Sequence, residues 1–319
     1  MRCLAFVLWL LLTGAGGASE LPILSGPAMG TTYRVMLAAD VPGMARGEVH
    51  REVEAVLARI DRAASTWRDD SDASLFNRAP TGDWVTVSAD LASLVETARV
   101  VHMQSDGAFD ITVGPLVRLW DSRGDEPTVA AIAAARSRVG MRWVEYRPVT
   151  AEAGPALRKS IDGVEIDLSG IAPGYAVDRI GERLVSLGSK AHLVELGGEV
   201  RAWGRASESR PWRVRLRGGD AEDGTPHSID LADGTAVATS TCRLGRSPID
   251  PRTGRPVAAT TLSTDSRPRR TATMRAASCA TADAWAVAAL VLGLEPDDDG
   301  TFTAPSRTAG PIGARQAGP

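Results

Sequence analysis

The spacing of apolar residues along the chain predicts a mixture of helices and strands. Over residues 48–64 the apolar side chains of Val49, Val53 and Ile60 recur at helical intervals, so one face of this helix would be apolar. The same spacing predicts helices over 91–103, 128–139 and 276–293. The last of these is apolar nearly all round, which is typical of a helix buried on every side.

Alternation of apolar and polar residues predicts the strands. It occurs over 29–37, where an early turn precedes the strand, and over 164–168. Between 191 and 216, alternating runs are broken by Gly197-Gly198, which predicts paired strands. From residue 297 to the end, acidic residues, Gly and Pro dominate, so a disordered tail is predicted over 297–319.

The short segment that follows the predicted strand 164–168 raises a question of function. This strand ends around Asp167 and is followed by the small-residue turn SGIAPG, after which helical spacing begins at Tyr175. Small residues between a strand and a helix N-terminus let a ligand, often a phosphate, approach the backbone. A carboxylate beside that position would repel a bare phosphate. The turn therefore either holds a metal–phosphate pair or is only a tight connection.

Asp283 is the single acidic residue on the apolar helix predicted over 276–293. Burying a carboxylate is costly unless it is paired, hydrogen-bonded or bound to a metal. With four His and no HxxxH or HExxH pattern, zinc is not favoured, whereas magnesium accepts carboxylate, backbone and phosphate oxygens. A salt bridge to one of the many Arg residues explains the same carboxylate equally well.

Composition narrows the class of protein and its compartment. The 319 residues suffice for one large or two modest domains, and a net charge of -3 gives no global attraction to nucleic acid. A positive Met1-Arg2, the apolar run LAFVLWLLL and small residues up to Ala18 predict a secretory signal peptide over 1–18. After cleavage Cys242 and Cys279 remain, either as a disulfide or as two buried thiols.

Eight short segments, each weak alone, occur in the order found in one family. The segments are MGTTY (29–33), STWRDDSDASLFN (65–77), GAFDITVGPLVRLW (107–120), DLSGIAPGYAVD (167–178), ELGGEVRAWG (195–204), ATSTCR (238–243), IDPRTGRP (249–256) and ATADAWAVAALVLG (280–293). Together they resemble the FAD:protein FMN transferases (the ApbE family) over residues 28–293.

This resemblance implies an α+β fold with mixed and antiparallel sheets, and an FAD cleft between two subregions of a domain spanning 19–296. It implies a magnesium-dependent enzyme that cleaves FAD, attaches FMN through its phosphate to a Thr or Ser of an acceptor protein, and releases AMP. A membrane redox-complex subunit is one kind of acceptor, and the location implied is the periplasm, in some members at the inner membrane. Hydrolysis of FAD to FMN and AMP, or binding of FAD without catalysis, remain as alternatives.

The resemblance also assigns roles to individual residues. The Gly170 carbonyl and the Asp283 carboxylate would be magnesium ligands, and Val287 occupies the position of a further ligand. Asp283 and Asn77 would serve catalysis, with Asn77 tuning transfer against hydrolysis. The expected FAD contacts are Met29, Trp67, Ala108, Phe109, Asp110, Asp167, Pro173 and Val257.

Four positions depart from the family pattern: Pro173, Thr241, Ser247 and Val287. Pro173 replaces Lys or Glu, Thr241 replaces Gly, and Ser247 replaces a frequent His. Val287 replaces Thr, which keeps the side-chain shape but removes the hydroxyl oxygen. The helix positions three and four residues from Asp283 offer no other oxygen ligand, so water or phosphate oxygens would have to complete the magnesium shell.

Overall fold

The structure is a computed structural model that describes residues 21–121, 126–151, 153–220, 226–242, 247–257, 270–295 and 301–305. The predicted signal peptide lies outside these residues. Among the helices described, none combines the length and the apolar character needed to cross a bilayer.

A mostly antiparallel sheet forms the centre of the molecule, and within the described residues it has seven strands in the order β1-β2-β6-β7-β10-β13-β14. All neighbouring pairs are antiparallel except β13 and β14. The strands are β1 (Ile23–Ala28), β2 (Thr31–Leu37), β6 (His192–Leu196), β7 (Glu199–Trp203), β10 (Ala236–Cys242), β13 (Arg270–Ala276) and β14 (Phe302–Thr303).

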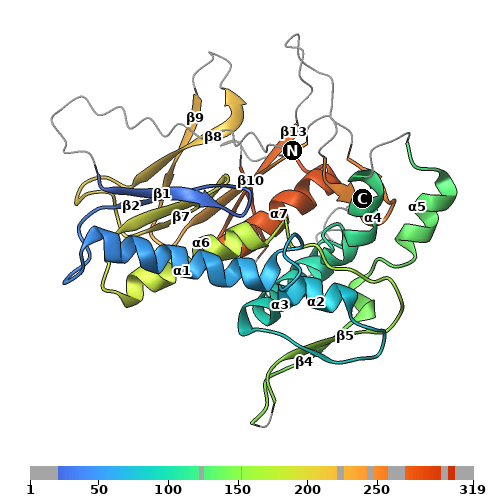
Figure 1. Cartoon of the computed structure of the whole chain (residues 1–319). Coiled ribbons are helices and arrows are strands. Elements are labelled where there is room, and N and C mark those ends of the chain that lie inside the picture. Colours follow the sequence, from blue (N-terminus) through green and yellow to red (C-terminus); the bar gives the residue numbers. More distant parts are fainter. Residues whose placement is uncertain are drawn as a thin grey trace.

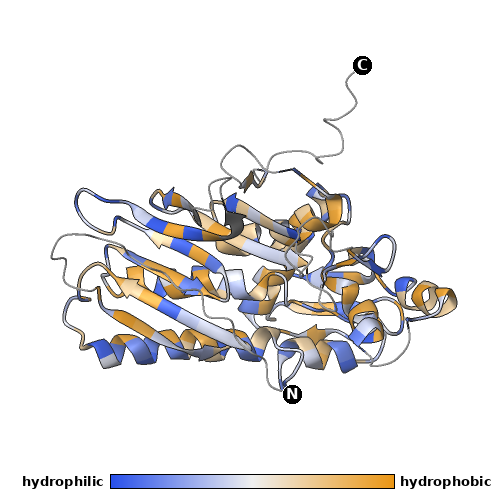
Figure 2. Ribbon diagram, turned by 90° about the horizontal axis from the view of Figure 1, so that it is seen from above, coloured by the Kyte–Doolittle hydropathy of each residue, from blue (hydrophilic) through white to orange (hydrophobic). Residues whose placement is uncertain are grey.

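Both faces of this sheet are covered, as the alternation of side chains along each strand requires. In β2, for example, Val35 and Leu37 face one apolar core, whereas Met36 faces the other. The larger core lies under the helices α1 (Arg46–Ala64), α3 (Ala89–Gln104), α6 (Ala172–Ser186) and α7 (Cys279–Leu292). The smaller core lies under the hairpin of β8 (Trp212–Asp220) and β9 (Pro226–Leu231), on the opposite side in Figure 1. The alternating colours along the strands in Figure 2 show the same pattern in hydropathy.

The remaining elements form two smaller units beside the main sheet. One is a three-stranded sheet of β3 (Val85–Thr86), β5 (Ala156–Lys159) and β4 (Val144–Arg147), near α2 (Asp72–Arg78). The other joins α4 (Gly114–Asp121) and α5 (Val129–Arg136) to the short hairpin of β11 (Ile249–Asp250) and β12 (Arg255–Pro256) through a separate apolar cluster. The short 3-10 turns η1 (Ile111–Val113) and η2 (Met141–Trp143) precede α4 and β4.

The helices predicted from apolar spacing are present, with ends that move by a few residues. In α1 the buried side chains include Val49, Val53, Val56 and Ile60, which confirms the predicted face. α7 buries side chains all round, begins at Ser278, whose side chain caps the Thr281 amide, and ends at Gly293 in the left-handed conformation.

Two predictions about local structure are wrong. Residues 164–168 alternate between buried and half-exposed, as predicted, but belong to no strand. Their backbone is hydrogen-bonded to the side chains of Asn77 and Lys159, and the Asp167 amide donates to the Ile111 carbonyl. The second is wrong for part of its range: of the tail predicted over 297–319 the structure describes residues 301–305, where Phe302 is buried in the core and β14 pairs with β13 through Met274. The other residues of the predicted tail lie outside the described residues.

Candidate functional site

A cavity of about 770 Å³ opens where the main sheet meets the α4–α5 unit. That volume lies in the upper part of the ~300–1,000 Å³ range of small-molecule sites. Its walls come from the ends of β7, β8 and β10, from α4 and the β11–β12 hairpin, from the turn after Asp167, and from α7. Residues distant in sequence therefore converge on one space between two subregions of the fold.

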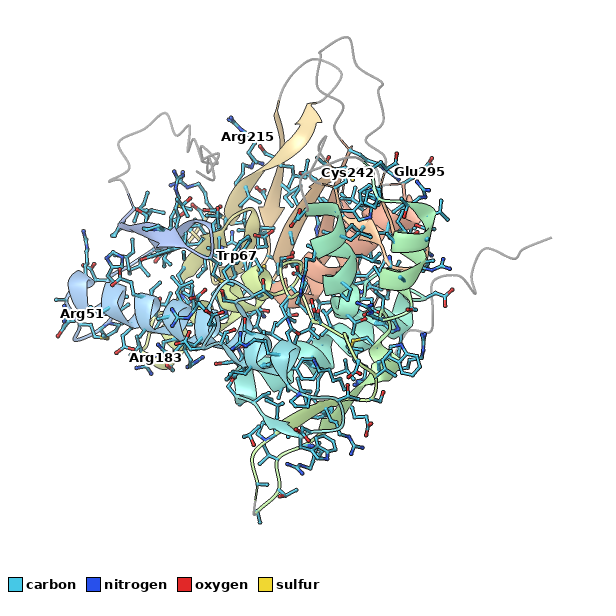
Figure 3. The ribbon with its side chains drawn as sticks, turned by 45° about the vertical axis from the view of Figure 1, so that its right-hand side comes forward. Arg51, Trp67, Arg183, Arg215, Cys242 and Glu295 are labelled. Carbon is cyan, nitrogen blue, oxygen red and sulfur yellow. The ribbon has the colours of Figure 1, made fainter. Side chains whose placement is uncertain are left out.

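Many of the residues predicted from the sequence line this cavity. They are Ala108, Phe109, Asp110, Asp167, Gly170, Asp283 and Val287, together with the departures Thr241 and Ser247. Met29, Trp67, Asn77, Pro173 and Val257 are not among the lining residues. Val257 follows the lining residue Pro256, and Trp67 projects from the loop between α1 and α2 with 94% of its surface exposed (Figure 3).

In the cavity lining, Gly170 lies close to both Phe109 and Val287. A Cβ atom added to Gly170 would lie 3.1 Å from Val287 Cγ2 and 3.5 Å from Phe109 Cε2. This close approach explains why a glycine stands at the turn between the segment 164–168 and α6. It also places the backbone of the turn beside the position where Val287 lacks a hydroxyl.

Asp283 reaches the same region from α7, one helical turn before Val287. Its Oδ2 accepts a hydrogen bond of 3.0 Å from the Gly174 amide at the start of α6, and the residue is 6% exposed. Burial, the largest cause, and the nearby charge of Asp178 together raise the pKa of this carboxyl to about 7, against the lowering effect of the Gly174 hydrogen bond. A salt bridge to Arg, the alternative interpretation from the sequence, is absent at Asp283 among the described residues.

The turn around Asp167 is held by hydrogen bonds on both sides. Asp167 N donates to the Ile111 carbonyl at 2.7 Å, and Asp167 Oδ1 accepts from Ser169 N at 2.8 Å. Pro173 occupies the first turn of α6, where its missing N–H costs no helical hydrogen bond. This departure therefore fits the backbone without strain.

Asn77 holds the segment before the turn in place of a neighbouring strand. Its Nδ2 donates to the Ile166 carbonyl at 2.9 Å, and its Oδ1 accepts from the Ile166 amide at 2.7 Å. Lys159, which is buried, donates from Nζ to the Asn77 carbonyl at 2.8 Å. The predicted catalytic Asn77 thus has its amide committed to the backbone next to Asp167, and any effect on chemistry would pass through that turn.

Asp110 is buried and its carboxylate is occupied by hydrogen bonds. Oδ1 accepts from the Thr112 amide at 2.8 Å and from its hydroxyl at 2.6 Å, while Oδ2 accepts from Met141 N at 3.2 Å. His102 Nδ1 lies 3.0 Å from the Phe109 carbonyl and 3.3 Å from Asp110 Oδ2. Asp110 therefore fixes the backbone that carries Ala108 and Phe109 at the cavity wall.

The charged lining is predominantly acidic. Among the described residues, the acidic members are Asp110, Asp121, Asp167, Glu199 and Asp283, and the single cationic member is Arg215 of β8 (Figure 3). An anionic ligand entering this space would be repelled unless a cation accompanied it. The described residues contain no group of three or more His, Cys, Asp or Glu side chains that could hold a metal by themselves. A metal here would thus share its shell with ligand oxygens and water, as magnesium commonly does.

The two cysteines within the described residues, Cys242 and Cys279, are both buried and free. Cys279 Sγ lies 3.7 Å from the Val200 carbonyl, and Val200 pairs with Val237 of β10. Cys242 stands five residues further along that strand, roughly 16 Å away at ~3.3 Å per residue, whereas a disulfide needs Cα atoms within about 7 Å.

We therefore expect both thiols to remain reduced in the folded protein. Burial raises the pKa of each thiol above its ordinary value, so neither is a reactive thiolate at neutral pH. Mass spectrometry of the unreduced, denatured protein after alkylation should show both cysteines modified. A mass two hydrogens lower with no alkylation would contradict this expectation.

Comparison with known proteins identifies the family of the chain. The family model described as ApbE family matches residues 29–298. The chain belongs to the ApbE family. A curated relative, the FAD:protein FMN transferase of Vibrio cholerae, is 33% identical over 302 residues, covering 90% of this chain and 86% of the relative. The FAD:protein FMN transferase of Escherichia coli K12 is 30% identical over 297 residues, covering 87% and 80%.

Solved structures of ApbE proteins share the fold. The flavin transferase ApbE from Vibrio cholerae superimposes with a TM-score of 0.74 at 32% identity, covering 88% of this chain and 89% of that one. The apo form of Pseudomonas stutzeri flavinyl transferase ApbE gives 0.73 at 32% identity, covering 88% and 86%. The predicted α+β class with mixed and antiparallel sheets is confirmed.

The motifs of the ApbE family did not indicate every residue that holds the site together. Lys159 and Asp178 are both buried and hydrogen-bonded to backbone beside the site. The chain has only two lysines, Lys159 and Lys190, and this rarity was a signal available in the sequence. Asp178 closes the segment DLSGIAPGYAVD, and its position after Gly-Tyr-Ala-Val would place it on the buried face of the helix.

Proposed function

We propose that this chain is a magnesium-dependent flavin transferase. It cleaves FAD, attaches FMN through a phosphoester to a Thr or Ser hydroxyl of an acceptor protein, and releases AMP. The observation that carries the proposal is the cavity in which Phe109, the Asp167 turn and Asp283 meet, in a chain of the ApbE family. The 770 Å³ space and the names of the relatives support FAD as the donor.

The residues present fit magnesium through oxygen donors. Asp283 offers a buried carboxylate, and a cation beside it would lower its raised pKa and favour the charged form. The Gly170 backbone lies against the same face of α7. When bound, magnesium would neutralise charge on the diphosphate. The acidic lining then becomes compatible with an anionic nucleotide, since a cation would lie between carboxylate and phosphate.

The chain's own groups would bind FAD, orient it toward the acceptor hydroxyl, and accept the hydroxyl proton. Transfer requires the acceptor hydroxyl oxygen to bond to the FMN phosphorus while the bond from that phosphorus to the AMP oxygen breaks. The hydroxyl proton must pass to a base, and no histidine lines the cavity among the described residues. With Ser247 at the position of the family histidine, a lining carboxylate or a water held by one would take that proton.

The decisive test mixes the purified protein with FAD, magnesium and a threonine-bearing acceptor domain. We expect a fluorescent acceptor band and AMP release in equal amounts. Free FMN with AMP and no labelled acceptor would instead show an FAD pyrophosphatase, and intact bound FAD would show a binding protein without catalysis. The same mixture with EDTA in place of magnesium serves as the control.

We propose further that the protein acts after export to the periplasm, where an acceptor could be a subunit of a membrane redox complex. The proposal rests on the sequence of residues 1–18. N-terminal sequencing of protein from a periplasmic fraction should begin near residue 19. An uncut N-terminus in the cytoplasmic fraction would contradict it.

Restoring a hydroxyl at position 287 should strengthen metal dependence. Val287→Thr keeps the shape beside Gly170 and adds an oxygen at the cavity wall. Val287 is half-buried at the cavity wall, so without metal we expect only a slight loss of stability, at or below the lower end of the ~1–3 kcal/mol cost of an unpaired buried polar group. With magnesium and FAD that cost should shrink, the half-saturating magnesium concentration should fall, and FAD cleavage should accelerate.

Titration of magnesium against AMP release measures this effect. Val291→Thr is the matched control, because it adds the same hydroxyl one turn further along α7, outside the cavity lining. An unchanged magnesium titration for Val287→Thr would show that position 287 does not face the metal.

A further inference from the structure

The N-terminal ends of α6 and α7 cap each other. The Gly174 amide near the start of α6 donates to Asp283 Oδ2 of α7 at 3.0 Å. In return, Asp178 of α6 accepts from the first two amides of α7, from Cys279 N to Oδ1 at 2.9 Å and from Ala280 N to Oδ2 at 3.0 Å. Each helix thus supplies a carboxylate to N–H groups in the other's first turn, which have no acceptor within their own helix.

Asp178 completes the capping of α7. Ser278 satisfies the next two amides, with Thr281 N donating to its hydroxyl at 3.2 Å and Ala282 N to its carbonyl at 3.1 Å. All four amides of the first turn therefore have partners, and two of them depend on Asp178. Since Cys279 and Ala280 are buried, loss of Asp178 would leave two N–H groups without water as a substitute.

Asp178 is itself fixed to the central sheet. Arg201 of β7 donates from one guanidinium nitrogen to Asp178 Oδ1 at 2.7 Å. The same guanidinium lies 4.9 Å from the centre of the Trp203 ring, and its Nε donates to the Gly234 carbonyl at 3.2 Å. Asp178 therefore joins sheet, α6 and α7 through one buried carboxylate.

From this arrangement we propose that Asp178 is a positioning residue for Asp283. Asp283 stands four residues after Cys279, so the first turn of α7 determines where its carboxylate lies at the cavity. Asp178 fixes that turn by accepting hydrogen bonds from two of its backbone amides, and Arg201 fixes Asp178 by donating to its carboxylate. The inference rests on the proposed function, in which Asp283 binds the metal.

Asp178→Asn is the informative variant, because it keeps the size and one carbonyl oxygen but loses the charge and one of the two amide acceptors. Mutation of groups that orient a metal ligand typically costs about 10–100-fold in metal affinity or activity. We expect the dissociation constant of Mn²⁺, titrated calorimetrically into the FAD-loaded protein without acceptor, to rise by about tenfold or more. Binding of FAD in EDTA, followed by flavin fluorescence, should stay within about twofold.

Two further variants separate positioning from a general loss of stability. Asp90→Asn removes another largely buried carboxylate, which accepts from the Tyr175 hydroxyl of α6 at 2.9 Å and from Arg59 of α1 at 2.7 Å. Neither of these bonds involves α7. Asp90→Asn should lower the melting temperature while leaving Mn²⁺ affinity unchanged. Arg201→Lys keeps a cation beside Asp178 and both amide bonds, so its Mn²⁺ affinity should stay close to that of the unmodified chain.

Folded Asp178→Asn with unchanged Mn²⁺ affinity would overturn the proposal, as would an equal loss of affinity in Asp90→Asn. The calorimetric titration measures metal binding and not transfer of FMN. It therefore distinguishes failure of the positioning role of Asp178 from failure of the proposed function. If the unmodified protein binds Mn²⁺ but labels no acceptor, the proposed function fails and the positioning role of Asp178 is still measured.

Discussion

Asp283→Ala should abolish magnesium-dependent FAD cleavage while the protein remains folded. Asp283 is the buried carboxylate at the cavity wall, and the α7 residues three and four positions from it offer no side-chain oxygen that could replace it. Removing the one side-chain oxygen ligand proposed for the metal should lower AMP release by at least about 100-fold, at the upper end of effects seen for metal-orienting groups. AMP release at saturating FAD, measured across a magnesium titration, checks this result.

The same variant should change how stability depends on pH. The pKa of Asp283 is raised from 3.8 to about 7 by burial, so the folded state holds this proton more tightly than the unfolded chain. Stability contributed by the protonated form is complete below about pH 4, falls as pH rises toward 7, and is constant above it. The total loss has an upper limit on the order of 4 kcal/mol, since one pKa unit corresponds to 1.36 kcal/mol.

Asp283→Ala removes this dependence, so its effect should reverse sign with pH. At pH 5 the variant loses the hydrogen bond from Gly174 and should melt lower than the unmodified protein. At pH 8 it no longer buries a charge and should melt at the same temperature or higher. Asp283→Asn keeps an oxygen for the Gly174 amide. At pH 8 it should therefore exceed the melting temperature of the unmodified protein by more than Asp283→Ala does.

Thermal melts in EDTA at the two pH values measure the reversal. If Asp283→Ala melts far below the unmodified protein at pH 8 and magnesium still stimulates cleavage normally, Asp283 is a structural residue and the metal assignment is wrong.

The fold was predictable where a side-chain pattern repeats over several turns. The apolar face of α1 and the all-round burial of α7 follow directly from spacing and composition. The segment 164–168 has the same alternation as a strand but no strand beside it, because Asn77 supplies the hydrogen bonds from 89 residues away. A period of two shows which side chains are buried and not what pairs with the backbone.

The candidate site was predictable only through motifs, and the structure explains why. Phe109, Gly170 and Val287 are far apart in sequence, and they lie close together because the segment before η1, the turn before α6 and α7 all meet at the cavity. Asp283 was recognisable alone, since an acid on an apolar helix requires a partner. Its partner, a backbone amide of another helix, and the reciprocal role of Asp178 depend on how two helix ends abut, which no local pattern shows.

Gly174→Ala should destabilise the protein and impair the site together. A Cβ at position 174 would lie 2.4 Å from the Cys279 carbonyl oxygen and 2.8 Å from Asp283 Cβ. These contacts are with backbone and with a buried side chain, so α6 and α7 must separate to accommodate the methyl group. Overpacking of a core costs about 1–3 kcal/mol, and the backbone contact places this variant at or above the top of that range.

That separation would break the bond between the Gly174 amide and Asp283 and move the carboxylate from the cavity wall. We therefore expect magnesium-dependent AMP release to fall by at least tenfold, even below the melting temperature of the variant, about the loss expected when a group that orients a metal ligand is disturbed. Chemical unfolding and a magnesium titration at low temperature measure the two effects on the same sample.

Gly47→Ala is the matched control, because Gly47 also lies in the first turn of a helix, α1, where an added Cβ would meet only the end of the Arg51 side chain at 3.9 Å. This control should gain about 0.4–1 kcal/mol from the reduced freedom of the unfolded chain. Equal stability and equal AMP release in both Gly→Ala variants would mean that the ends of α6 and α7 do not abut as described, and that the position of Asp283 does not depend on their packing.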